Sequence, residues 1–156
     1  MNTDEYLYFL DRAFDGIIAA VTELGDDLAN TSPPWGDANS PWAIGYHCTE
    51  VARYWIGHLI GGRTSTRDRM SEFNAQGAGA QLIHIVDELR ADLREDLSGF
   101  DATAPLANTP PVEYEGPSRD LTPSGVLLHV LEELAQHHGQ VQMSRDILLG
   151  AAQVVP

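Results

Sequence analysis

The spacing of apolar residues near the start of the chain is the feature that most restricts its fold. From position 3 to position 28 these residues follow one another at steps of three and four, which places side chains on one face of an α-helix. The residues in this row are Leu7, Leu10, Phe14, Ile17, Val21, Leu24 and Leu28. The sequence therefore predicts one amphipathic helix over residues 3–28.

Three later segments repeat the helical spacing and are separated by stretches rich in proline and glycine. Ser40 followed by Pro41 is typical of a helix cap and first turn, and predicts a helix over residues 41–60. Two further helices are predicted over residues 80–97 and, with Thr122 as the cap, over residues 123–149. The pattern predicts an all-α protein, a four-helix bundle with residues 1–156 as a single domain. The long connections 61–79 and 98–123 are expected to shape any pocket.

Composition and charge argue against several classes of function. The apolar runs are interrupted well before the roughly 20 residues that a membrane-spanning helix needs. The chain has 9 basic residues, all arginine, against 23 acidic ones, and its formal net charge of -14 disfavours binding to nucleic acid or to an anionic membrane surface. Its N-terminal segment is acidic, unlike a secretory signal, and Cys48 is its one cysteine. We therefore expect a cytoplasmic protein with a reduced thiol.

A glutamate and a histidine one helical turn apart, Glu133 and His137, form the first candidate for a metal site. Residues four apart lie on the same face of a helix, so both side chains can reach one ion. The apolar residues around them place this face at the edge of the core, where an unpaired carboxylate costs roughly several kcal/mol. A Glu–His hydrogen bond at the edge of the core explains the motif as well as a bound cation does.

His47 adds a third potential ligand, because it lies on the face of the 41–60 helix that is expected to point into the bundle. A histidine in a core is usually hydrogen-bonded and has no further role. Together with Glu133 and His137, however, it would supply three ligands from two facing helices, with no fourth protein ligand evident. Three protein ligands and an open position are typical of a catalytic metal rather than a structural one.

The other histidines and the cysteine are weaker candidates. His129 lies one helical turn before the glutamate and is the best candidate for a spare ligand, while His138 is expected outside the bundle or beside the ligands. His58 and His84 are expected at the surface or at its edge. Cys48 could in principle act as a nucleophile, but its histidine neighbour points about 100 degrees away on the helix, which favours a packing role.

Two segments resemble the DinB-like family. Residues 40–62, SPWAIGYHCTEVARYWIGHLIGG, are similar to the second helix of that family, and residues 127–148, LLHVLEELAQHHGQVQMSRDIL, are similar to its last helix. The resemblance implies an up-down-down-up bundle with long crossover loops, and a metal triad of His47, Glu133 and His137. Glutamate rather than histidine at position 133 is similar to the branch that contains mycothiol-dependent maleylpyruvate isomerase and the mycothiol S-transferases.

The resemblance implies a metal-dependent enzyme, either a thiol S-transferase or a thiol-dependent isomerase that uses a metal-bound thiolate. Its partners would be a low-molecular-weight, mycothiol-like thiol and a small electrophile. Zinc suits the ligands and a sulfur substrate best, and nickel and Fe(II) are compatible. A metal-dependent hydrolase on the same site and a non-catalytic metal-binding or stress-response bundle remain as alternatives. The resemblance assigns no catalytic or thiol-binding residue.

A homodimer is also expected, because bundles of this size with aromatic-rich helices often pair. Trp35, Trp42 or Tyr8 would supply the apolar contact patch.

Overall fold

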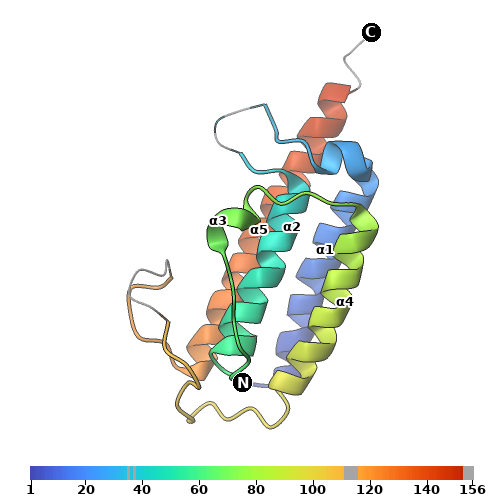
Figure 1. The fold of residues 1–156 in the computed structure, drawn as a ribbon. Coiled ribbons are helices and arrows are strands. Elements are labelled where there is room, and N and C mark those ends of the chain that lie inside the picture. Colours follow the sequence, from blue (N-terminus) through green and yellow to red (C-terminus); the bar gives the residue numbers. More distant parts are fainter. Residues whose placement is uncertain (35, 37, 111–115, 153–156) are drawn as a thin grey trace.

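The computed structural model describes residues 1–34, 36, 38–110 and 116–152, and all of its regular elements are helical (Figure 1). The four predicted helices are confirmed, and a short additional helix lies in the connection between the second and third of them. The elements are α1 (Thr3–Ala29), α2 (Pro41–Ala52), η1 (Arg53–His58), α3 (Arg69–Glu72), α4 (Gly79–Asp96) and α5 (Pro123–Ala152). None of the described helices has the length and apolar character needed to cross a membrane.

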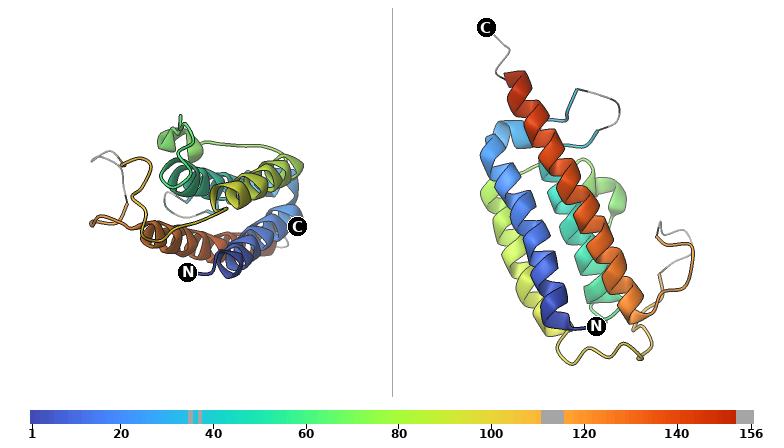
Figure 2. Two further views of the ribbon diagram at one scale, coloured as in Figure 1. Left: turned by 90° about the horizontal axis from the view of Figure 1, so that it is seen from below. Right: turned by 180° about the vertical axis from the view of Figure 1, so that it is seen from behind.

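The four long helices form two layers, with α2 and α4 in one and α1 and α5 in the other (Figure 2). Helices α1 and α5 run in one direction, and α2 and α4 run in the opposite direction (Figure 1). The predicted up-down-down-up bundle is therefore confirmed. Because α2 and α4 run the same way, the chain between them must return along the length of the bundle, and this return carries α3, which packs on α2.

The predicted caps are present at the starts of α2 and α5. The Ser40 hydroxyl accepts a hydrogen bond from the backbone N–H of Ala43 at 3.2 Å, and Pro41 occupies the first turn of α2. The Thr122 hydroxyl accepts one from the N–H of Gly125 at 3.2 Å at the start of α5. Side-chain oxygens in these positions satisfy N–H groups that have no partner inside the helix.

The apolar rows found in the sequence form the core. In α2 and η1 the whole predicted inner face is buried: Ile44, His47, Cys48, Val51, Trp55 and also Leu59, which follows η1. The inner rows of the other three helices meet this face, with Phe14 of α1, Leu89 of α4 and Leu134 of α5 completely buried. A helix that buries one face in this way fixes which of its polar residues also point inward.

The second helix ends differently from the prediction, because its last six residues form the π-helical turn η1. Here backbone N–H groups reach back five residues, as in the hydrogen bonds from Leu59 to Tyr54 at 3.2 Å and from Gly61 to Ile56 at 2.9 Å. A π-helical turn carries more residues than an α-helical turn, so it changes the direction of the side chains that follow. Such turns often occur at functional sites.

Trp42 is not an exposed contact residue, so the expectation that it contributes to a dimer patch is wrong. Its ring is buried, stacks on Tyr46 with 5.6 Å between ring centroids, and its indole N–H donates to the carbonyl of Ala78 at 3.0 Å. The returning connection covers this ring, and the helical spacing of α2 alone could not show that. Tyr8 is 58% exposed, and Trp35 lies outside the described residues.

Candidate metal centre

Helices α2 and α5 bring together the three predicted ligands. One ligand atom each from His47, Glu133 and His137 lies within 4.8 Å of the other two. The rings of His47 and His137 are 5.0 Å apart and nearly perpendicular, and the Nε2 atom of His137 is 3.5 Å from a carboxylate oxygen of Glu133. His47 is buried, while the other two side chains are partly exposed. The predicted convergence of three donors from two facing helices is therefore present.

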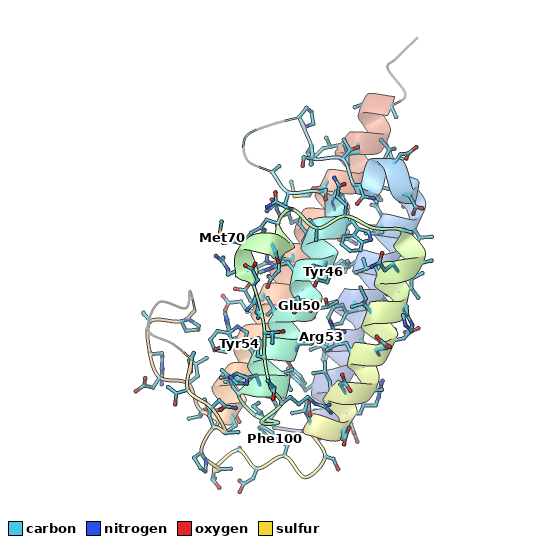
Figure 3. The ribbon with its side chains drawn as sticks, viewed as in Figure 1. Tyr46, Glu50, Arg53, Tyr54, Met70 and Phe100 are labelled. Carbon is cyan, nitrogen blue, oxygen red and sulfur yellow. The ribbon has the colours of Figure 1, made fainter. Side chains whose placement is uncertain are left out.

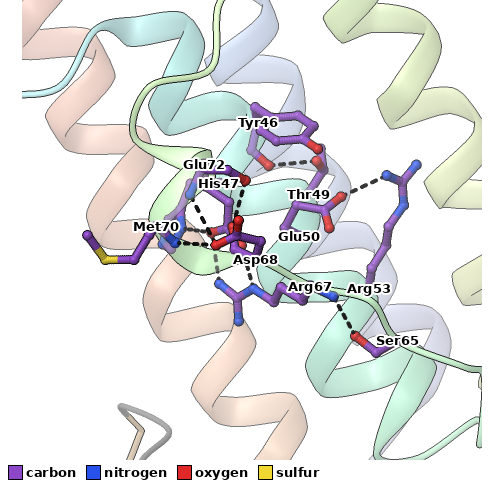
Figure 4. Close-up of polar contacts among 11 residues, drawn as sticks. Tyr46, His47, Thr49, Glu50, Arg53, Ser65, Arg67, Asp68, Met70 and Glu72 are labelled. Atoms are coloured by element: carbon purple, nitrogen blue, oxygen red, sulfur yellow. Dashed lines mark hydrogen bonds and ion pairs between the residues drawn. The ribbon is translucent and has the colours of Figure 1, made fainter.

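His47 is held from the side by residues of the α2–α4 connection (Figure 4). Its Nδ1–H donates to the carboxylate of Glu72 across 2.6 Å, and the guanidinium of Arg67 donates twice to the same carboxylate, at 2.6 and 3.0 Å. The side chains of Glu72 and Arg67 are only 1% and 4% exposed. A neutral imidazole that carries its proton on Nδ1 presents a lone pair on Nε2, which is the form that can ligate a metal.

Glu72 stays ionised in spite of its burial. Burial acts to raise the pKa of its carboxyl group, but the hydrogen bonds from His47 and Arg67 outweigh this and leave the pKa below its ordinary value. The sequence did not reveal this residue, because the segment around it lacks helical periodicity. Asp68 is a weak sequence signal for the short helix α3, which ends at Glu72. Its carboxylate caps this helix by accepting hydrogen bonds from the N–H groups of Met70 and Ser71 at 3.1 and 3.4 Å.

His137 is oriented within its own helix. Its Nδ1–H donates to the side-chain oxygen of Gln140, three residues later, at 3.0 Å. Burial acts to lower the pKa of His137, but its hydrogen bonds with Glu133 and Gln140 leave the pKa above its ordinary value. The same bond to His137 keeps the pKa of Glu133 below its ordinary value. Without a bound cation, the Glu133 carboxylate therefore favours the protonated form of His137.

A cavity of about 370 Å³ opens beside Glu133. Its wall comes from α2, η1 and α5 and from both long connections. The sequence predicted that these two connections would shape any pocket. The lining residues are Val51, Trp55, Arg67, Arg69, Gly116, Pro117, His129, Glu132 and Glu133. Glu133 therefore belongs both to the group of three donors and to the wall of a cavity that is large enough for a small molecule.

His129 faces this cavity and lies outside the group of three donors, so the structure does not support its expected role as a spare ligand. Its ring meets Trp55 edge to face, with 4.6 Å between centroids, and its buried Nδ1 has no hydrogen-bond partner among the described residues. Burial lowers the pKa of His129, against the opposing effect of the Glu133 carboxylate. It is a neutral polar group on the wall of the cavity.

The remaining candidates lie away from the centre. His138 packs over Gly16 of α1, where a side chain larger than glycine would clash with its ring. His84 is exposed, and the Nδ1–H of His58 donates to the carbonyl of Arg63 at 2.6 Å. Cys48 is completely buried, and burial, followed by the carboxylates of the site, raises the pKa of its thiol well above the ordinary value.

Comparison with known proteins points in the same direction as the geometry. The family described as Mycothiol-S-transferase matches the chain over residues 6–150, which covers all four long helices almost completely. No curated protein matches the chain. The family assignment agrees with the resemblance found in the sequence, including its choice of the branch that contains the mycothiol S-transferases.

Proposed function

The chain belongs to the mycothiol S-transferase family, and from this premise we propose that it transfers a low-molecular-weight thiol to a small electrophile with the help of one divalent cation. His47, Glu133 and His137 would hold the cation. The observation that carries the proposal is the position of these three donors, within 4.8 Å of one another and beside a cavity of about 370 Å³ that shares Glu133.

The donor set fits a divalent cation. Two imidazoles and one carboxylate are typical of zinc, and nickel or Fe(II) are also compatible with them. The second nitrogen of each imidazole is already engaged, by Glu72 at His47 and by Gln140 at His137. Metal-ligating histidines almost always have such a partner, because it fixes the ring and its tautomer.

The residues of the centre also suit thiol chemistry. Glu133 supplies one negative charge and the two imidazoles supply none, so a divalent cation held by them would retain a net positive charge. When bound, such a cation favours a thiolate over a thiol near neutral pH. Trp55 and Val51 add apolar surface to a cavity whose wall also carries the charged side chains of Arg67, Arg69 and Glu132.

The test has two parts, and the first concerns metal content. We expect about one zinc ion per chain in the wild type, and loss of zinc in His47→Ala, Glu133→Ala and His137→Ala. His84→Ala is the matched control, because His84 is exposed and lies on α4. Full zinc content in all three site variants, measured by elemental analysis, would refute the assignment of the ligands.

The second part concerns the reaction. The zinc-loaded protein is incubated with a model electrophile and with mycothiol, other low-molecular-weight thiols or no thiol, and product is measured with and without a chelator. We expect product only when thiol and metal are both present. Hydrolysis of ester or amide substrates without thiol would instead identify a metal-dependent hydrolase, and metal binding without either activity would identify a binding or stress-response protein.

A further inference from the structure

We propose that Glu72 and Arg67 are positioning residues for His47, and that through them the α2–α4 connection is a working part of the metal centre. This inference rests on the proposed function, because it requires His47 to be a ligand. Nothing in the family assignment names either residue. The two residues act through His47 and need not touch the thiol or the electrophile.

Geometry is the first argument. The contacts run in one line, from the Arg67 guanidinium to the Glu72 carboxylate and from that carboxylate to the Nδ1–H of His47 (Figure 4). Each of these side chains is at most 5% exposed. A carboxylate that receives an imidazole N–H fixes the tautomer of the ring, so Nε2 of His47 keeps its lone pair directed away from Glu72.

Charge is the second argument. A buried carboxylate is costly unless it is paired and hydrogen-bonded, and Arg67 meets this requirement with two parallel donors. The positive charge of Arg67 balances the negative charge of Glu72. The pair therefore orients His47 without adding net charge to the centre, where Glu133 remains the carboxylate that faces the two imidazoles.

Packing is the third argument. Phe73, the residue after Glu72, stacks on the face of the His47 ring with 5.2 Å between centroids. His137 meets the same ring edge to face. Glu72 thus contacts the imidazole along its edge, and Phe73 contacts it on its face. These two residues are neighbours in the α2–α4 connection. A ligand that is held in this way loses little freedom when a metal binds.

The connection also reaches the cavity. Arg67 and Arg69 line the wall beside Glu133, while Met70, between Arg69 and Glu72, points out into solvent (Figure 3). One short segment therefore contacts both the ligand His47 and the space proposed for the substrate. Metal binding should make this segment more rigid, because it fixes the imidazole to which Glu72 is bonded.

The experiment measures zinc affinity by competition with a chromophoric chelator, so it does not depend on activity. Glu72→Gln keeps the shape of the side chain and removes its charge, and we expect zinc binding to weaken by about 10 to 100-fold. Glu72→Asp, which restores the carboxylate, should recover part of the loss. Glu50→Gln is the control, since Glu50 is also a glutamate of low exposure paired with an arginine, Arg53 at 2.8 Å, and lies outside the group of three donors.

A second measurement needs no variant at all. Nitrogen chemical shifts of the zinc-loaded wild type should show His47 with its proton on Nδ1, and hydrogen exchange of residues 61–78 should slow when zinc is added. Wild-type protein that binds no zinc would overturn the proposed function. Protein that binds zinc tightly but shows His47 protonated on Nε2, or equal zinc affinity in a folded Glu72→Gln variant, would overturn this inference alone.

Discussion

Substitution of Cys48 separates two sources of the nucleophile, the thiol of the protein and the small-molecule thiol. Cys48 directly follows the proposed ligand His47 in the chain, so a role in the reaction is a natural alternative. Its side chain is completely buried, and burial together with the nearby carboxylates of Glu133 and Glu72 raises the pKa of the thiol. A thiol in this environment is protonated at neutral pH and cannot meet an electrophile.

The cost of the substitution is expected in stability and not in rate. Cys48→Ala deletes one methyl-sized group from a packed core, which costs about 1 kcal/mol. Cys48→Ser keeps the size but buries a hydroxyl group, which costs roughly 1–3 kcal/mol if it finds no partner. For a chain of this length, 1 kcal/mol corresponds to about 2–4 °C in Tm. We therefore expect Tm to fall by about 2–4 °C in Cys48→Ala and by about 2–12 °C in Cys48→Ser.

The assay compares zinc content, Tm and the rate of thiol transfer in the wild type and in both variants at a temperature well below every Tm. Transfer at the wild-type rate in both variants is the expected result. Iodoacetamide should label Cys48 slowly in the native protein and fast in denaturant. A folded variant with full zinc content and no transfer would show that the nucleophile is Cys48, and the reasoning from burial would be wrong.

Three further predictions concern metal, cavity and assembly. Zinc at about 100 times its dissociation constant should stabilise the fold by about 2.7 kcal/mol and raise Tm by about 5–11 °C, with no shift in His137→Ala, as measured by thermal melting. His129→Phe should bind zinc normally and raise KM for thiol or electrophile, because Nδ1 of His129 has no hydrogen-bond partner among the described residues and faces the cavity. Weaker zinc binding would instead make His129 a ligand. Light scattering at tens of micromolar protein should report a homodimer, twice the 17.0 kDa chain mass, and Tyr8→Glu should favour the monomer.

The helices and their buried faces could be predicted because the information for them is local, whereas their up-down-down-up order was implied by the resemblance to the DinB-like family. The steps of three and four along α1 identify a helix and its buried face at the same time, and the Ser40–Pro41 pair marks the start of α2. The π-helical turn at the end of α2 could not be predicted, because its residues have ordinary helical character and the hydrogen-bond shift depends on packing. The burial of Trp42 also depends on a contact with Ala78, which is distant in the sequence.

The residues of the candidate site also differ in whether the sequence alone could predict them. Glu133 and His137 are four residues apart on one helix, so their common face follows from helix geometry, and His47 follows from the apolar residues around it. Glu72 lies 25 residues beyond His47 in a connection without periodicity, and its contact with the imidazole depends on how that connection crosses the bundle. Local patterns therefore identified the three candidate ligands, and only the folded chain showed which residues orient the His47 ring.

The surroundings of the three donors also bear on whether Glu133 and His137 are merely a hydrogen-bonded pair at the edge of the core. Such a pair needs only its two members, which lie 3.5 Å apart on one helix. It gives no reason for His47 to face them from another helix, or for a buried Arg67–Glu72 pair to hold that imidazole. Nor does it explain why the second nitrogen of His137 is bonded to Gln140. A bound cation would account for all of these features together, because a ligating imidazole offers one nitrogen to the metal and almost always has the other fixed by a hydrogen bond.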